Sequence, residues 1–101
     1  MQVNQNFDIP VIVTNADGSA ATLDPGAPAT ANDPSITVTL DAAQNSVNVR
    51  SADVVVAAAV LTVDGAVGGV KATPGTFDFT VDAAPVPATI TFGPPTTPVA
   101  N

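Results

Sequence analysis

The sequence predicts an all-β chain without disulfides. Valine, threonine and isoleucine recur in alternating runs that are separated by clusters of proline, glycine, asparagine and aspartate, a pattern typical of strands joined by turns. Strong helix formers are scarce, with one methionine and no glutamate, so little of the chain is suited to an amphipathic helix. Cysteine is absent, and aliphatic side chains and phenylalanine must therefore close the core.

Composition limits both the domain count and the partners. The chain has 101 residues, of which 46% are hydrophobic and 11% charged, which fits one folded domain and not a disordered chain. Its formal net charge of -7 would repel phosphate backbones and anionic lipid. The longest apolar run, residues 54–61, is far shorter than the roughly 20 residues of a membrane-spanning helix. We expect neither nucleic acid nor a membrane as a partner.

The first third of the chain predicts one edge strand and a proline-rich connection. Residues 8–14 form the first strand, placed at a sheet edge because Pro10 lacks an N–H group. A turn at residues 15–19 leads to a short second segment at residues 20–23. Three prolines in residues 24–34 exclude a central strand and favour an ordered loop or an extended edge segment.

The middle of the chain predicts a hairpin followed by a more buried element. Residues 35–40 alternate cleanly, and residues 46–50 follow a turn with the same period, which indicates two paired strands. Residues 53–64 are apolar without alternation. We expect a strand buried on both faces, or two strand segments around the alanines at 57–59. Periodicity alone also allows a buried helix over residues 54–61, which three consecutive valines disfavour.

The last third predicts a flexible connection and two aromatic strands. Residues 64–75 are rich in glycine and form one flexible end of the domain. Residues 76–81 place Phe77, Phe79 and Val81 on one face of a strand, and residues 88–92 do the same with Ile90 and Phe92 facing inward.

About seven short strands at spacings of 8 to 12 residues are typical of an immunoglobulin-like β-sandwich of antiparallel strands. The predicted boundaries are an N-terminal arm at residues 1–7, the sandwich at residues 8–93, and a proline-rich tail at residues 94–101. The prolines prevent the tail from extending a sheet. It is expected to be an extended exit segment or an arm that orders on a partner.

No catalytic or cofactor-binding residue is predicted. The absence of histidine, cysteine, tryptophan, tyrosine and glutamate removes thiol and imidazole chemistry. Lys71 lies in the glycine-rich connection without a serine three residues before it, and a solvated loop charge explains it. Asp78 and Asp82 project to the same face of one strand, where solvent-facing carboxylates are expected. We therefore expect a protein that is not an enzyme.

Four loop aspartates are the candidates for a structural calcium, because Ca²⁺ takes six to eight oxygen ligands in proteins. They are Asp17, Asp24, Asp33 and Asp64. None has the spacing of a dedicated calcium loop, and side-chain hydrogen bonds to the turn backbone explain an aspartate beside glycine or proline. We expect no metal site, with a structural calcium as the alternative.

Five segments of the chain, taken in order, carry a resemblance to a known family. They are residues 15–18 (Asn-Ala-Asp-Gly), 32–38 (Asn-Asp-Pro-Ser-Ile-Thr-Val), 61–64 (Leu-Thr-Val-Asp), 75–81 (Gly-Thr-Phe-Asp-Phe-Thr-Val) and 88–93 (Ala-Thr-Ile-Thr-Phe-Gly). Over most of its length the sequence resembles the small single-domain Ig-like proteins of tailed bacteriophages. Where a role is known, such proteins decorate or cement the outside of the capsid. The resemblance therefore implies a structural virion protein, made in the host cytoplasm and located on the outer capsid surface.

The implied partner is the major capsid (coat) protein, bound by a homo-oligomer such as a trimer at the symmetry axes of the shell. A surface low in charge also suits packing against another protein, although a small stable sandwich would have it too. We expect docking through Val3 and Phe7 of the arm or through Pro94, Pro95 and Pro98 of the tail.

The alternative is a host-surface or carbohydrate-binding module on a phage tail or head fibre. Such modules normally stack sugars on exposed aromatic side chains. The chain has neither tryptophan nor tyrosine, which weakens this alternative.

Overall fold

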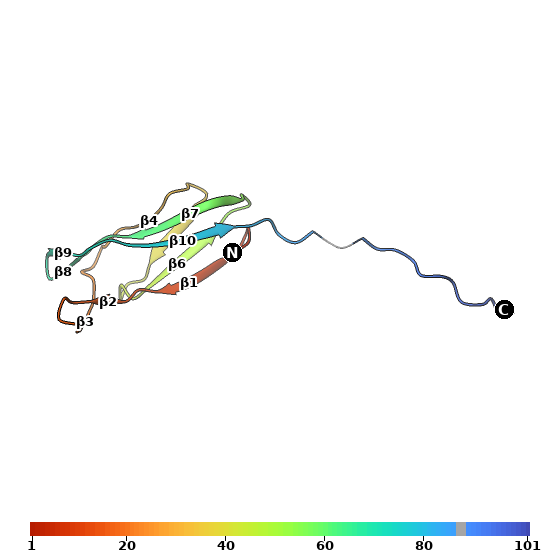
Figure 1. Ribbon diagram of the computed structural model, residues 1–101, viewed down its shortest axis with the longest axis horizontal. Helices are drawn as coiled ribbons and strands as arrows, with labels where there is room; N and C mark the ends of the chain where they lie inside the picture. The colour runs from red at the N-terminus through yellow and green to blue at the C-terminus, as the bar shows by residue number, and fades with distance from the viewer. Residues whose placement is uncertain (87–88) are drawn as a thin grey trace.

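The computed structural model describes residues 1–86 and 89–101 and confirms the all-β prediction (Figure 1). These residues contain ten short strands and no helix, so none of them forms a helix that could cross a membrane. The strands are β1 (Asn6–Pro10), β2 (Val13–Thr14), β3 (Ala20–Ala21), β4 (Ala29–Ala31), β5 (Ile36–Leu40), β6 (Ser46–Ser51), β7 (Val56–Val63), β8 (Ala66–Val67), β9 (Val70–Lys71) and β10 (Gly75–Val81).

The first three-stranded sheet has the order β1-β6-β5 and is antiparallel throughout. Val49 of β6 lies opposite Phe7 on one side and Val38 on the other. The predicted hairpin of β5 and β6 is confirmed. The prediction that the strand containing Pro10 lies at an edge is also confirmed, because β1 is the outer strand of the order β1-β6-β5.

The second three-stranded sheet has the order β10-β7-β4 and is also antiparallel. Its edge strand β4 comes from the proline-rich connection, so the extended edge segment is the correct alternative there. The expectation that residues 53–64 are buried on both faces, or divide into two segments, is wrong. β7 is one strand whose Ala57 and Ala58 are exposed while Ala59 and Leu61 are buried. Its register against β10 shifts between the pairs Ala59–Phe79 and Val56–Val81, so one extra residue interrupts the alternation at these alanines.

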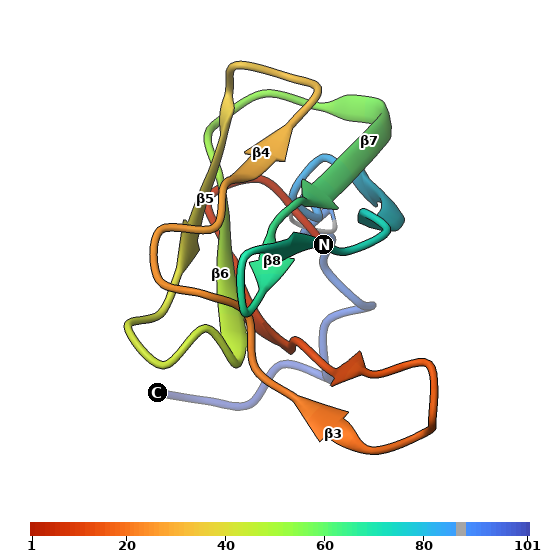
Figure 2. The same ribbon diagram turned by 90° about the vertical axis from the view of Figure 1, so that its left-hand side faces the viewer.

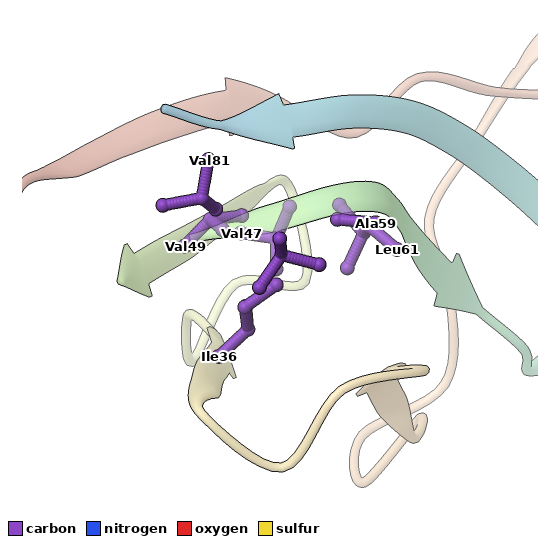
Figure 3. Close-up of a cluster of buried hydrophobic side chains, with 7 residues drawn as sticks. Ile36, Val47, Val49, Ala59, Leu61 and Val81 are labelled. Carbon is purple, nitrogen blue, oxygen red and sulfur yellow. The ribbon is translucent and has the colours of Figure 1, made fainter. Parts of the chain in front are cut away.

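The core lies between these two sheets (Figure 3). Each strand contributes its inward positions, and the central strand β6 supplies Val47 and Val49, which are almost completely buried. Burial of one such side chain contributes about 1.5–3 kcal/mol to stability. The cluster comprises Ile36, Val47, Val49, Val56, Ala59, Leu61 and Val81.

Two small hairpins extend the body at one end, β2 with β3 and β8 with β9 (Figures 1 and 2). The turn of the second hairpin uses Gly68 and Gly69, which both have positive φ, a conformation that glycine adopts without steric cost. Their N–H groups donate to the Asp24 carboxylate at 3.0 and 2.8 Å. Residues 64–75, predicted as a flexible glycine-rich end, thus contain a hydrogen-bonded hairpin. The two-residue strands raise the strand number among the described residues above the predicted seven.

The N-terminal residues lie against the body. Gln2 forms a parallel bridge with Asp82, next to the end of β10. The Val3 N–H group donates to the Asp82 carbonyl oxygen at 2.9 Å, and β1 begins at Asn6. Residues 1–7, predicted as an arm, are therefore in contact with both three-stranded sheets.

The chain beyond β10 extends away from the body (Figure 1). The inward orientation predicted for Ile90 and Phe92 is wrong, because these side chains are 88% and 97% exposed and residues 89–92 belong to no strand. The first residue of that predicted strand, Ala88, lies outside the described residues. The radius of gyration is 22.4 Å, compared with about 13 Å for a compact chain of this length. Residues 89–92 alternate as a strand does, but no sheet edge within residues 1–86 and 89–101 pairs with them.

Candidate binding surface

The predicted docking residues divide into two groups. Val3 and Phe7 are half-buried and pack against the core cluster. Pro94, Pro95 and Pro98 are exposed on the extended C-terminal segment, which we define as residues 83–86 and 89–101. The structure does not bring the two groups together, because the first belongs to the body and the second lies beyond it (Figure 1).

Three phenylalanines cluster at the side of the body where β1 and β10 are the edge strands. Phe7 of β1 meets Phe79 of β10 edge to face, with ring centroids 6.1 Å apart. Phe77 stacks on Phe79 at 6.0 Å and remains 44% exposed. The sequence predicts the shared face of Phe77 and Phe79, but the exposure of Phe77 depends on β10 lying at an edge.

Residues 1–3 cover one end of the outer edge of β10. The Met1 amino group donates to the Thr80 carbonyl oxygen at 3.1 Å. The Asp82 N–H group donates to the Met1 carbonyl oxygen at 2.9 Å, and the Val3 N–H group donates to the Asp82 carbonyl oxygen. The backbone N–H and C=O groups that point outward here therefore belong to Thr80, in β10, and to Asp82, directly after it.

The rest of this edge, residues 75–79, has no strand beside it among the described residues. We call it the open edge. Successive residues of a strand direct their backbone groups to opposite sides, so Thr76 and Asp78 continue the outward series begun by Thr80 and Asp82. The open edge thus presents backbone donors and acceptors that can pair with a further strand.

An apolar groove of about 720 Å³ continues from the open edge at the end of the body that carries the small hairpins. It lies between the residues that follow β1 and those that lead into β10. Ile12 and Val70 line it and are 85% and 72% exposed. Its lining residues are Val11, Ile12, Val13, Thr14, Asn15, Ala16, Leu23, Val63, Gly65, Val67, Val70, Lys71, Ala72, Thr73 and Gly75.

The C-terminal segment contains no charged side chain. Its four large hydrophobic side chains, Val86, Ile90, Phe92 and Val99, are each at least 86% exposed. Exposed apolar side chains on an extended segment are typical of a peptide that binds a protein surface. Such a segment is therefore the second component of the candidate surface.

The loop aspartates serve the local backbone. Asp17 accepts hydrogen bonds from the Ser19 hydroxyl at 2.6 Å and the Ser19 N–H group at 3.0 Å. Asp33 accepts the equivalent pair from Ser35 at 2.6 and 2.9 Å. These bonds, the hydroxyl bond first, hold the pKa of both carboxyl groups below the usual value.

The other two calcium candidates are also engaged. Asp24 holds the turn at Gly68 and Gly69, and Asp64 lies 3.8 Å from the ammonium group of Lys71. Residues 1–86 and 89–101 contain no group of three side chains that could hold a metal ion. Lys71 is mostly exposed and forms a surface ion pair with the Asp64 carboxylate.

Comparison of the chain with protein families, with curated proteins and with solved structures finds no match. The candidate surface therefore rests on the geometry described above. The sequence analysis did not predict the open edge or the groove, because both depend on which strand lies at the edge of a sheet. The one signal in the sequence is the alternation of residues 89–92. It indicates a segment that is able to form a strand, but not the edge with which that segment would pair.

Proposed function

We propose that this chain is a non-enzymatic structural protein of a bacteriophage virion, which decorates and stabilises the outer capsid surface by binding coat subunits. The observation that carries the proposal is the uncharged C-terminal segment, which extends from the folded body with its apolar side chains exposed. A folded body with a projecting binding segment suits attachment to a preassembled surface. The resemblance of the sequence to phage Ig-like proteins supports the choice of that surface.

The fold belonging to this proposal is an Ig-like β-sandwich. The orders β1-β6-β5 and β10-β7-β4 give two facing antiparallel sheets, which is the arrangement of such domains. No cysteine is available to join the sheets, and the valine-rich core replaces a disulfide. In this interpretation β1 and β10 are the edge strands on one side of the sandwich.

The proline residues of the tail are the first docking contacts to test. Pro94, Pro95 and Pro98 are exposed, and closely spaced prolines favour an extended conformation that loses little entropy on binding. Val3 and Phe7 pack against the core, so a coat contact through them would be limited to their exposed parts. On the shell, the protein would act as an oligomer, and a trimer at the symmetry axes is the arrangement proposed.

Co-sedimentation with undecorated capsids tests the proposal, with unassembled coat protein as the comparison. We expect saturable binding to assembled shells at a copy number that matches their symmetry. Replacement of Pro94, Pro95 and Pro98 together by alanine should weaken binding at least tenfold, whereas the matched Thr96→Ala/Thr97→Ala variant should bind as the parent does. Absence of binding across protein concentration and salt would overturn the capsid role.

The second candidate is a host-surface or carbohydrate-binding module on a tail or head fibre. It is favoured by two exposed aromatic side chains, Phe77 at 44% and Phe92 at 97% exposure, since sugars stack on such rings. Binding to host glycans that is lost in Phe77→Ala or Phe92→Ala, together with no binding to capsids, would replace the first proposal by this one.

A further inference from the structure

Each copy of the chain carries both an unpaired strand edge and an unpaired strand-like segment. The open edge, residues 75–79 of β10, has no strand beside it among the described residues. Residues 89–92 alternate threonine with Ile90 and Phe92, and both of these apolar side chains are exposed. An unpaired edge and an amphipathic extended segment are the two halves of a β-augmentation contact.

The chain's own segment does not reach the open edge by a simple turn. A hairpin after β10 would first pair with the outer edge of Thr80 and Asp82, which Met1 and Val3 already occupy. The sequence between Asp82 and residue 89 has no glycine or asparagine for a tight turn. Pro85 favours extended backbone at itself and at Ala84.

The positions of the two elements favour a contact between copies. The segment leaves the body at the end where the N-terminus lies, whereas the groove beside the open edge lies at the opposite end, with the small hairpins (Figure 1). A segment from a second copy would enter at the groove and run along β10 toward Met1. Residues 1–3 already run in that direction, because the bridge between Gln2 and Asp82 is parallel.

We propose that residues 89–92 of one copy pair in parallel with the open edge of β10 in a second copy, and so link the chains head to tail. Ile90 and Phe92 then face the aromatic group of Phe77 and Phe79, and Thr89 and Thr91 face outward. Pro94 and Pro95 follow after Gly93 and end the added strand before it meets Met1 of the receiving copy. This inference does not depend on the capsid role.

The charge distribution fits residues 89–92 as the strand that is added to a second copy. All nine aspartates and both basic residues lie within residues 8–82, so the net charge of -7 belongs to the body and the segment is uncharged. An uncharged segment can enter the groove of another copy although the two bodies repel each other. Since salt screens that repulsion, the association should strengthen as ionic strength rises. Weakening by salt would contradict an apolar strand contact.

The first experiment measures the mass of the full chain by light scattering and sedimentation from micromolar to millimolar concentration. We expect assembly beyond the 9.9 kDa monomer, growing with concentration, because a head-to-tail contact leaves a free edge and a free segment at the ends of an open chain. A protein that stays monomeric over this range would overturn the inference.

Two pairs of variants locate the contact. Ile90→Asp/Phe92→Asp should weaken self-association at least about 100-fold, because charged groups replace two buried apolar ones. The matched Thr89→Asp/Thr91→Asp variant alters the outward face of the same segment and should still assemble. Equal loss of assembly in both variants would contradict the proposed facing of the strand.

Blocking the open edge should have the same effect from the receiving side. Asp78→Pro removes an outward N–H group, and Phe77→Asp alters the apolar side of the same edge; the second variant serves if the first loses its fold by circular dichroism. The Ile90→Asp/Phe92→Asp chain keeps an intact open edge, and each chain with a blocked edge keeps an intact segment at residues 89–92. A mixture of the two therefore has one working contact. The mixture should contain a 1:1 dimer although each variant alone is monomeric, and a mixture that remains monomeric would overturn the inference.

Capsid binding gives a separate readout. Failure of the mixing experiment with normal co-sedimentation would remove only the strand contact between copies. Normal assembly without co-sedimentation would remove only the coat partner.

Discussion

The rings of Phe7 and Phe79 meet edge to face, with centroids 6.1 Å apart and planes inclined at 84°. This contact joins β1 of one sheet to β10 of the other, at the side where neither strand has a further neighbour in the part of the chain that the structure describes. Edge-to-face aromatic pairs contribute about 0.5–1.5 kcal/mol beyond their buried area. The aromatic pair therefore stabilises the packing of the two sheets at β1 and β10, which belong to different sheets and do not pair with each other.

A double-mutant cycle on this pair should detect the coupling. Phe7→Leu and Phe79→Leu should each lower the free energy of unfolding by about 1–2 kcal/mol, and the double variant should lose about 1 kcal/mol less than their sum. Urea unfolding at neutral pH measures these differences. Fully additive losses would mean that the two rings act independently.

Ser51 should contribute more to stability than its size indicates. Its buried hydroxyl accepts the Gln5 N–H group at 3.0 Å and donates to the Gln2 carbonyl oxygen at 2.7 Å, so it connects the N-terminal residues to β6. Ser51→Ala should cost about 1–3 kcal/mol, because polar backbone groups lose their partner. Thr37→Ala, at an exposed position on the adjacent strand, is the control and should change stability by less than about 0.5 kcal/mol. A similar loss in both variants would assign the effect to strand propensity.

Gly65 should not tolerate a side chain. A Cβ atom there would lie 2.9 Å from the Ala27 Cβ atom and 3.3 Å from the Leu23 Cδ2 atom. Gly65→Ala should therefore lower the free energy of unfolding by about 1–3 kcal/mol through overpacking. Gly75→Ala is the matched control, because nothing lies within 4 Å of its added Cβ. Thermal unfolding of both variants distinguishes crowding from the general cost of replacing glycine.

Acid should weaken two turns of the fold. The Ser19 and Ser35 hydroxyl groups hold the pKa of Asp17 and Asp33 below the usual value. A carboxyl group with a lowered folded pKa contributes stability above its unfolded pKa of about 3.9, and the contribution is lost as pH falls through the folded pKa. Stability should therefore decline below about pH 4.

Serine replacement tests the cause of each pKa shift separately. Ser35→Ala should return the pKa of Asp33 toward its ordinary value and leave that of Asp17 unchanged, while Ser19→Ala should do the reverse. Carboxyl titration by NMR measures both groups in each variant. A lowered Asp33 pKa that survives Ser35→Ala would assign the shift to another cause.

Local pattern was sufficient for much of the fold because it reports which residues can form a strand. The alternation of residues 35–40 and 76–81 predicted the faces of β5 and β10, and Pro10 predicted an edge strand because proline lacks an N–H donor. The exposure of Pro94, Pro95 and Pro98 also follows from the sequence, since three prolines exclude a sheet.

Other features depended on contacts between distant parts of the chain. β4 forms within the proline-rich connection because Ala29 and Ala31 find a partner edge on β7. Ala57 and Ala58 are both exposed because the register between β7 and β10 shifts there and places one extra residue on β7. The open edge of β10 exists because Met1 and its neighbours occupy only the last residues of that strand.

The sequence by itself determined an acidic, disulfide-free β protein with strands near their observed positions, because period, proline and charge act locally. Only the tertiary structure decided which edges are paired, where the groove lies, and that Ile90 and Phe92 face solvent. Pairing decides these features because a strand's neighbour is chosen by hydrogen-bond partners and packing surfaces supplied by other parts of the chain.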